Sequence, residues 1–195
     1  MGNRKPLYGV GINDADYQVA IRVTVDKVTT TTFECPYYKR WSEMLKRCYS
    51  AKYHDKKPTY KGCRVCDEWK YFSNFKVWME KQPWEGKQLD KDIVIKGNKV
   101  YSPTTCKFIS SITNSFTTES LSIRGKYLIG VSFGCGKFRS RVSNPFTKKV
   151  EHLGSFSTEL EAHLVWKKRK HELSFLVAEL EEDTIVKEAL TTRYL

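Results

Sequence analysis

Two carboxylates and a lysine form the group of side chains in this sequence with the clearest chemical potential. Asp90 and Asp92 are two residues apart in the segment LDKDIVIKG, with Lys91 between them. Side chains two apart on a strand point to the same face. Both carboxylates can therefore hold one divalent cation such as Mg²⁺, whose bound water supplies a nucleophile. The same residues also fit a hairpin decorated with charge and without catalysis, so both interpretations stay open.

The stretch that would position these side chains runs from residue 89 to residue 114. Apolar and polar residues alternate over 89–95, which is typical of a half-buried strand. Residues 96–99 contain Gly and Asn and predict a tight turn, after which a return strand starts at residue 100. Ser102 and Pro103 are suited to begin a short helix that ends near Asn114. The sequence therefore predicts a ββα unit in which Asn114 could face Asp90.

The charge of the chain predicts its class of partner. The 195 residues carry a net charge of +12, and 13% of them are aromatic. The aromatic content is too high for a disordered basic tail. A folded basic surface commonly binds a polyanion, because Lys and Arg that neutralise phosphates release condensed counterions. RNA would suit such a surface as well as duplex DNA, although DNA is the partner we expect.

The chain has no sequence feature of a membrane or secreted protein. No apolar run is long enough to span a bilayer, and the first residues contain no apolar signal segment. We therefore expect a cytoplasmic protein with reduced thiols and no membrane partner. Cys63 and Cys66 form a single CxxC without a second pair of ligands, so buried thiols are expected and a structural zinc ion is not.

Helices and strands are expected to alternate along the chain. Residues 36–49 and 67–81 have helical spacing of apolar residues, and residues 1–34 predict one or two strands or an extended arm. Residues 127–133, 137–143 and 149–156 predict three strands, followed by a helix capped by Ser157. The predicted fold class is α+β.

The second of these three strands has an unusual distribution of charge. Lys137, Arg139 and Arg141 share one face of it, and Phe138, Ser140 and Val142 share the other. Three cations on one face repel one another unless an anion lies across them, which favours a nucleic-acid contact. Further cations before and after the strands extend the predicted DNA-binding set, namely Arg124, Lys126, Lys148 and Lys149.

Residues in this part of the chain resemble the AP2 DNA-binding domain. The matching residues are Gly130-Val131, Lys137-Phe138, Leu153-Gly154-Ser155-Phe156 and Thr158-xx-Glu161-Ala162. The resemblance implies three antiparallel strands packed on one helix, with the sheet in the major groove. It places Ser132, Lys137, Arg139 and Arg141 at DNA-contacting positions. The chain departs from the family at Phe138, where the plant domains have Trp, and its turns are shorter.

The earlier part of the chain resembles phage-encoded HNH endonucleases. The matching residues are Trp41-xx-Met44-Leu45-xx-Cys48-Tyr49, Val65-Cys66-xx-Trp69-xx-Phe72-xx-Phe75, Leu89-Asp90-Lys91-Asp92 and Tyr101-Ser102-Pro103-xx-Cys106. HNH and AP2 parts occur together in phage homing-type nucleases. The two resemblances cover roughly residues 36–176.

The HNH resemblance implies a role for each residue of the carboxylate group. Asp90 and Asn114 match metal-ligand positions, and Lys91 stands where a general-base His is expected. An ordinary lysine is protonated at neutral pH and cannot accept a proton. Two routes to activity stay open: Asp90 and Asp92 hold the ion whose water attacks, or burial favours the neutral form of Lys91.

The prediction is a two-part DNA-binding protein. Residues 1–115 form an HNH-like domain with an N-terminal arm, 116–123 a linker, 124–178 an AP2-like domain and 179–195 an acidic tail. This tail could cover part of the basic surface or pack as a last helix. The expected function is sequence-specific binding of double-stranded DNA with divalent-metal-dependent cleavage, in a phage-infected bacterial host. The alternative is a catalytically inactive HNH-derived regulator or blocking protein.

Overall fold

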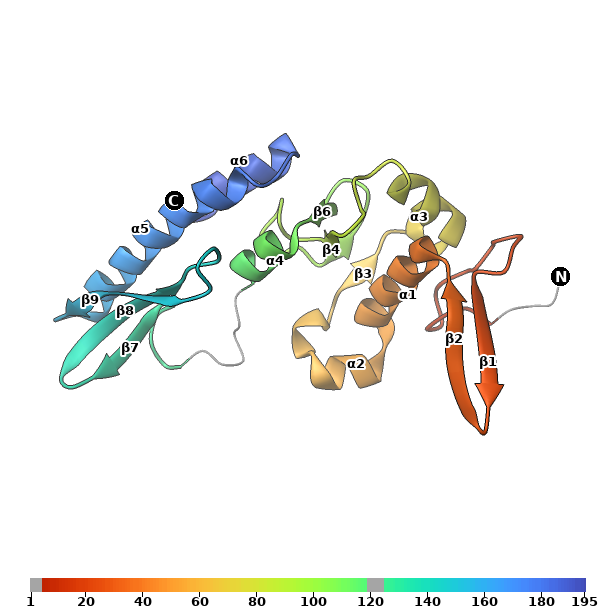
Figure 1. The fold of residues 1–195 in the computed structure, drawn as a ribbon, viewed down its shortest axis with the longest axis horizontal. Helices are drawn as coiled ribbons and strands as arrows, with labels where there is room; N and C mark the ends of the chain where they lie inside the picture. Colours follow the sequence, from red (N-terminus) through yellow and green to blue (C-terminus); the bar gives the residue numbers. More distant parts are fainter. Residues whose placement is uncertain (1–4, 119–124) are drawn as a thin grey trace. The chain divides into compact units, whose positions relative to one another are not determined.

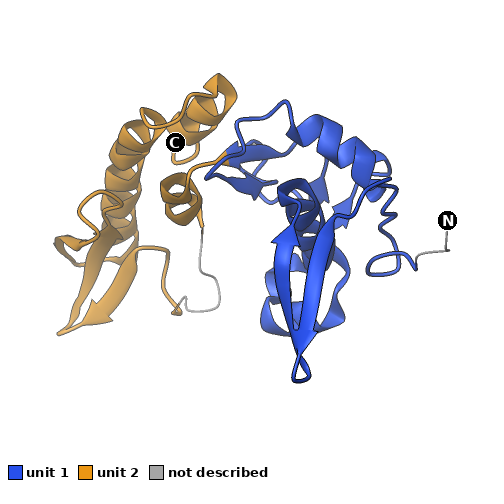
Figure 2. Ribbon diagram, turned by 45° about the vertical axis from the view of Figure 1, so that its right-hand side comes forward, with its two compact units in different colours: residues 1–108 blue, residues 109–195 orange. Residues whose placement is uncertain are grey.

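The structure is a computed structural model that describes residues 5–118 and 125–195. The chain divides into two compact units, Met1–Phe108 and Ile109–Leu195 (Figures 1 and 2). Both units contain helices and small sheets, which agrees with the expected mixture of helix and strand.

Unit 1 has an aromatic core built mainly by its first and third helices, and its second helix has no buried residue. The helices are α1 (Pro36–Tyr49), α2 (Ala51–Lys56) and α3 (Phe72–Met79), with the 3-10 turns η1 (Pro58–Tyr60) and η2 (Glu68–Lys70). The bounds predicted for the first helix are confirmed by α1. The core includes Trp41, whose indole donates a hydrogen bond of 2.7 Å to the carbonyl of Trp69.

The single helix predicted over residues 67–81 is wrong at its beginning. Tyr71 is extended and separates η2 from α3. The backbone of Ile12 pairs there, since its N–H donates to Lys70 and its carbonyl accepts from Phe72. Gly11 lets the same segment lie close to α1, because a Cβ on Gly11 would lie 2.3 Å from a methyl group of Leu45.

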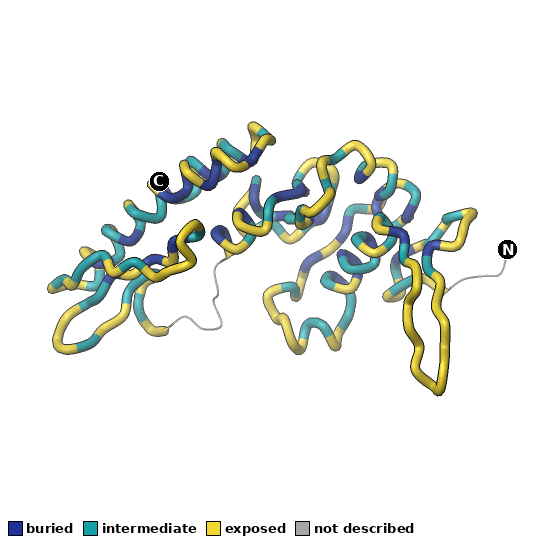
Figure 3. The backbone as a smooth tube through the Cα atoms, in the orientation of Figure 1, coloured by how far each residue is buried: buried dark blue, intermediate teal, exposed yellow. Residues whose placement is uncertain are grey.

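The N-terminal segment contains two antiparallel strands, β1 (Ala20–Val25) and β2 (Val28–Glu34). Asp26 and Lys27 form the turn, both with positive φ. Nearly all of this hairpin is exposed, as the tube in Figure 3 shows. The structure therefore selects the two-strand alternative among those predicted for residues 1–34.

The predicted hairpin around the carboxylates is wrong. β4 (Gln88–Asp90) pairs with β6 (Lys107–Ile109), whereas β5 (Val100–Tyr101) pairs in parallel with β3 (Arg64–Val65). The strand ends at Asp90, and an irregular loop follows because side chains replace the expected ladder. The Asn98 amide donates to the carbonyls of Lys91 and Val100, each at 2.7 Å.

The predicted helix over residues 103–114 is also wrong. Residues 102–106 form a turn in which the Cys106 N–H donates to the Ser102 carbonyl. The helix α4 (Ser111–Thr117) begins later, and the Ser110 hydroxyl caps it by accepting from the Thr113 N–H at 3.1 Å. Pro103 therefore starts a turn and not a helix.

Unit 2 contains the predicted antiparallel sheet of three strands. They are β7 (Val131–Gly134), β8 (Lys137–Ser143) and β9 (Val150–Phe156), in the order β7-β8-β9. The sheet packs on α5 (Glu159–Ala178), as predicted. Thr158, and not Ser157, caps this helix: its hydroxyl accepts from the Glu161 N–H, and the Glu161 carboxylate accepts from the Thr158 N–H.

The acidic C-terminal residues pack as a last helix, which is one of the two alternatives predicted for them. They contain α6 (Thr184–Thr192), whose Val186 and Leu190 are fully buried. Glu181, only 3% exposed, accepts hydrogen bonds from the Ser110 N–H and the Thr113 hydroxyl of α4. α4 and α6 are thus integral to unit 2.

The predicted linker begins inside this unit. Phe116 is buried, and its ring centroid lies 5.7 Å from that of Tyr194. The division between the units falls at residues 108 and 109. Residues 119–123 of the predicted linker lie outside the described residues.

Candidate nucleic-acid interface and carboxylate site

The outer face of the β7–β9 sheet gathers the cations predicted for DNA binding. Ser132 and Arg139 are directly paired across β7 and β8, and Arg141 is paired with His152 across β8 and β9. Paired residues point to the same face of a sheet. Lys137 joins them by alternation along β8. We call Ser132, Lys137, Arg139 and Arg141 the cationic sheet face.

The opposite face of the sheet forms the core of unit 2. Ser140 and Val142 are buried, which confirms the predicted alternation along β8. Trp166 of α5 packs close to Gly130, where a Cβ would lie 2.1 Å from the indole. Gly130 also has positive φ (82°). The absence of a side chain therefore allows both the close contact with Trp166 and this backbone conformation.

The carboxylate nearest to these strands is turned away from the cationic sheet face. Glu151 pairs with the buried Val142 and so lies on the inner face. Its carboxylate accepts from Arg169 at 2.8 Å and from Asn144 at 2.6 Å. These hydrogen bonds lower the pKa of Glu151 to about 2. Among the described residues, no carboxylate forms an ion pair with Lys137, Arg139 or Arg141.

Arg139 is held in place by the turn between β7 and β8. Its guanidinium donates to the Cys135 sulfur at 3.1 Å and lies over Gly134. Cys135 has positive φ (54°), as does Gly136, so this tight turn brings the sulfur back toward the strand. The Arg139 side chain is nevertheless only partly buried.

The other predicted DNA-binding cations lie around the sheet. Lys126 is exposed, with its ammonium 5.1 Å from the centre of the Tyr127 ring. Lys148 and Lys149 are exposed in the turn between β8 and β9, which Asn144 closes by backbone hydrogen bonds to both. Arg124 lies outside the described residues.

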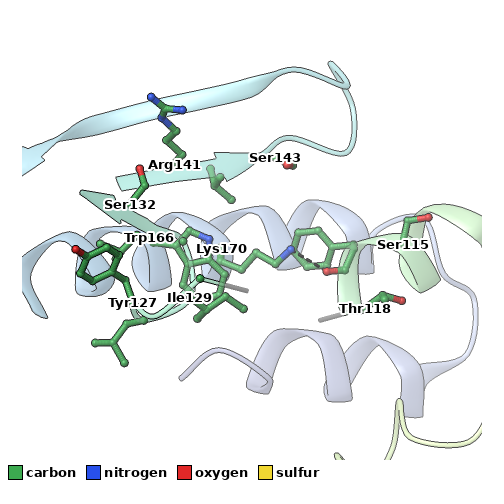
Figure 4. Close-up of a pocket in the computed structure, with 15 residues that line it drawn as sticks. Ser115, Thr118, Tyr127, Ile129, Ser132, Arg141, Ser143, Trp166 and Lys170 are labelled. Atoms are coloured by element: carbon green, nitrogen blue, oxygen red, sulfur yellow. Dashed lines mark hydrogen bonds between the residues drawn. The ribbon is translucent and has the colours of Figure 1, made fainter. Parts of the chain in front are cut away.

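A groove of about 540 Å³ lies beside the sheet within unit 2 (Figure 4). Arg141 and Ser132 line it together with the aromatic residues Tyr127 and Trp166. Lys170 reaches along it, donates to the Phe116 carbonyl at 2.8 Å and lies 3.5 Å from the centre of that ring. Two residues of the cationic sheet face therefore adjoin a hollow with aromatic walls.

The carboxylate site in unit 1 is built around Asp90. Its Oδ1 accepts from the backbone N–H groups of Asp92 (2.9 Å) and Ile93 (2.6 Å). Lys91 is 8% exposed, and its ammonium lies 3.2 Å from Oδ2 of Asp92. Asp90 thus ends β4 and shapes the loop, while Lys91 neutralises the second carboxylate.

Asp90 and Asp92 are close enough to perturb each other. Burial raises the pKa of Asp90 to about 6, and the nearby carboxylate of Asp92 adds to this rise. A cation between them would relieve the repulsion, so the pair fits the chemistry of a hard divalent ion.

Asn114, the third predicted metal ligand, lies in the other unit of the chain. It belongs to unit 2 as part of α4, whereas Asp90 and Asp92 belong to unit 1. The described residues contain no group of three or more His, Cys, Asp and Glu side chains arranged around a metal position. Mg²⁺ often takes one or two carboxylates and completes its shell with water and substrate phosphate. Asp90 and Asp92 would provide that number of carboxylate ligands.

The sequence analysis did not predict that Arg47 and Tyr60 would lie near the carboxylates. The Arg47 guanidinium donates to the Leu89 carbonyl at 3.5 Å and lies 5.9 Å from the centre of the Tyr60 ring. Tyr60 in turn interacts electrostatically with Lys91 and Asp90. Arg47 follows the buried Met44 by three residues, and this helical spacing could have indicated that Arg47 faces the interior of unit 1.

The cysteines of unit 1 lie in or near its core. Cys48 and Cys63 are buried, and Cys66 is half-buried. Burial raises the pKa of the Cys48 thiol to about 12 and that of Cys66 to about 11. Both thiols are therefore protonated at neutral pH.

Comparisons of the chain with models of protein families, with curated proteins and with solved structures find no match. No helix in residues 5–118 or 125–195 has the length and apolar character needed to cross a bilayer. Function is therefore inferred from the chemistry of the two sites.

Proposed function

We propose that the protein binds double-stranded DNA through the cationic sheet face. The observation that carries the proposal is the alignment of Lys137, Arg139 and Arg141 on one side of β8, without a carboxylate partner among the described residues. The major groove of DNA admits β-structure, and arginine can donate two hydrogen bonds to guanine. Lysine contacts to phosphate would add affinity.

The AP2 resemblance supports the same proposal. Three antiparallel strands on one helix are the arrangement that the resemblance implies, and unit 2 has them in that order. By this resemblance, Arg139 and Arg141 read bases or hold phosphates, and Ser132 and Lys137 lie next to them. Lys126, Lys148 and Lys149 would contact the flanking backbone.

Equilibrium binding to duplex DNA tests the proposal. The double variant Arg139→Ala/Arg141→Ala should bind at least about tenfold more weakly, since base or phosphate contacts of this kind contribute about 1–3 kcal/mol each. The control Arg22→Ala/Lys27→Ala removes two exposed cations from the β1–β2 hairpin. Equal affinity in the two double variants would contradict the proposal. Competition with single-stranded and double-stranded RNA tests whether the protein prefers duplex DNA to RNA.

A second candidate function is cleavage of the bound DNA with a divalent ion. The observation in its favour is the closeness of Asp90 and Asp92, together with the raised pKa of Asp90. Asp90 and Asp92 would bind Mg²⁺ or a similar ion, and the ion would supply the activated water. Lys91 is paired with Asp92, so its role would be to contact the phosphate and not to accept a proton. Such a protein fits a phage homing-type endonuclease in the host cytoplasm.

The same ion pair supports the inactive alternative. The Lys91 ammonium already neutralises Asp92, so a DNA-binding regulator or blocking protein needs no metal. Purified protein should be incubated with phage or host DNA in Mg²⁺, in Mn²⁺ and in EDTA. Discrete fragments that require the metal and disappear in Asp90→Asn would establish the endonuclease. Tight binding with intact DNA would establish the inactive binder.

A further inference from the structure

Half of the net charge of the protein lies in one short segment of unit 1. Residues 46–64 contain seven lysines and arginines but a single carboxylate, Asp55, which gives a net charge of +6 out of +12. This segment covers the end of α1, then α2, η1 and the start of β3. It is separate from the cationic sheet face, which belongs to unit 2.

Aromatic contacts hold this segment as a fixed platform. The rings of Tyr53 and Tyr60 lie 5.6 Å apart and join α2 to η1. Lys46 and Arg47 lie over these two rings at 5.7 and 5.9 Å. The Lys99 ammonium donates to the Thr59 carbonyl at 2.6 Å and ties η1 to the strand pair β3–β5.

The outer cations of the segment have no counter-charge within the described part of the chain. Lys52, Lys56, Lys57 and Lys61 are exposed, and no carboxylate there forms an ion pair with them. Other lysines of the same unit do have such a partner, as Lys70 has Asp67 at 2.6 Å. Four like charges within ten residues of the chain repel one another, and a polyanion relieves the repulsion.

We infer that Lys52, Lys56, Lys57 and Lys61 form a second DNA-contacting surface, which holds the phosphate backbone of the duplex without reading its sequence. The inference rests on the proposed DNA binding but uses a different unit. An exposed lysine suits phosphate as a point charge, whereas base reading needs a planar donor group. Tyr60 directly precedes Lys61, and Arg47 links it to the carboxylate loop, since the guanidinium lies 5.9 Å from the Tyr60 ring centre and donates to the Leu89 carbonyl.

The salt dependence of binding to a duplex of arbitrary sequence tests this inference. The triple variant Lys56→Ala/Lys57→Ala/Lys61→Ala should reduce the slope of log K against log salt by about 2.7, which is roughly 0.9 for each lost phosphate contact. Lys56→Arg/Lys57→Arg/Lys61→Arg should keep the slope, because it preserves charge. The control Arg22→Ala/Lys27→Ala/Lys81→Ala removes three exposed cations of unit 1 outside this surface.

The outcomes separate the two proposals. If the triple lysine variant has the same slope and affinity as the control while Arg139→Ala/Arg141→Ala binds weakly, the second-surface proposal is overturned. The proposal that the sheet binds DNA would then remain. Loss of affinity in the triple variant alone would support the second surface and overturn the sheet. Failure of the wild-type protein to bind duplex would overturn both, and so would a preference for RNA that depends on the three lysines.

Discussion

The cationic sheet face and the carboxylate site both concentrate charge, but they treat it in opposite ways. At the sheet, Lys137, Arg139 and Arg141 have no carboxylate partner among the described residues. At the loop, Asp90 accepts two backbone N–H groups and Asp92 is paired with Lys91. Charge without an internal partner is available to an external one, whereas compensated charge can serve the fold alone. The comparison therefore makes DNA binding the primary proposal and catalysis the secondary one.

The largest effect on stability is expected at Gly130, where the sheet of unit 2 packs against α5. Gly130→Ala should destabilise unit 2 by about 2–4 kcal/mol, because its Cβ would overlap the Trp166 indole at positive φ. Gly136→Ala is the matched control, since Gly136 has positive φ but nothing near its Cβ. It should cost only about 1 kcal/mol. Thermal unfolding measures both, and equal losses would contradict the close packing at Gly130.

The carboxylate site should reveal itself in the pH dependence of stability. The pKa of Asp90 is raised in the folded state, so the protonated form is favoured there. Its contribution is complete below pH 4 and is lost as the pH rises through about 6. Wild-type stability should therefore fall by roughly 2–3 kcal/mol between pH 4 and pH 7. Asp90→Asn keeps the acceptor for the two N–H groups and should remove this decline. An unchanged pH profile in Asp90→Asn would show that Asp90 is not buried beside a second charge.

The ion pair next to Asp90 should control metal affinity. Lys91→Ala removes the ammonium that lies 3.2 Å from Asp92 and leaves two uncompensated carboxylates. Mn²⁺ should then bind about tenfold more tightly, equivalent to about 1.4 kcal/mol, and calorimetric titration measures this directly. Lys91→Arg should behave as the wild type. Equal Mn²⁺ binding by all three proteins would mean that the carboxylates do not act together.

The smallest effect is expected at the start of α5. Thr158→Ala removes the hydroxyl that accepts from the Glu161 N–H and should cost about 1 kcal/mol in unfolding free energy. Ser157→Ala is the control, because Ser157 was the predicted cap but Thr158 occupies that place. A larger loss in Ser157→Ala would contradict the observed cap.

Sequence periodicity predicted the sheet of unit 2 better than the loop of unit 1, and the reason is physical. The alternation along β8 continues over seven residues, so one register satisfies both faces. Around Asp90 the alternation is short, and the side chains of Asp90 and Asn98 replace ladder hydrogen bonds. Whether a side chain takes the place of a backbone hydrogen bond depends on three-dimensional contacts, and the local sequence pattern does not predict these contacts.

Long-range packing explains the other differences between prediction and structure. Tyr71 leaves the helical conformation because residues around Ile12 pair with it, and these lie about sixty positions earlier in the chain. Glu181 belongs to a segment that reads as an acidic tail, yet it is buried against α4. Composition alone gives no sign of a buried carboxylate with two hydrogen-bond donors.

The central claim is that the cationic sheet face binds duplex DNA, and a salt titration of binding tests it most directly. Affinities of the wild type, Arg139→Ala/Arg141→Ala and Arg22→Ala/Lys27→Ala would be measured from 50 to 200 mM salt. If both arginines contact phosphates, the first double variant should bind more weakly throughout, with a slope reduced by up to about 1.8, whereas the second should follow the wild type. Identical affinities and slopes for all three proteins would contradict the claim.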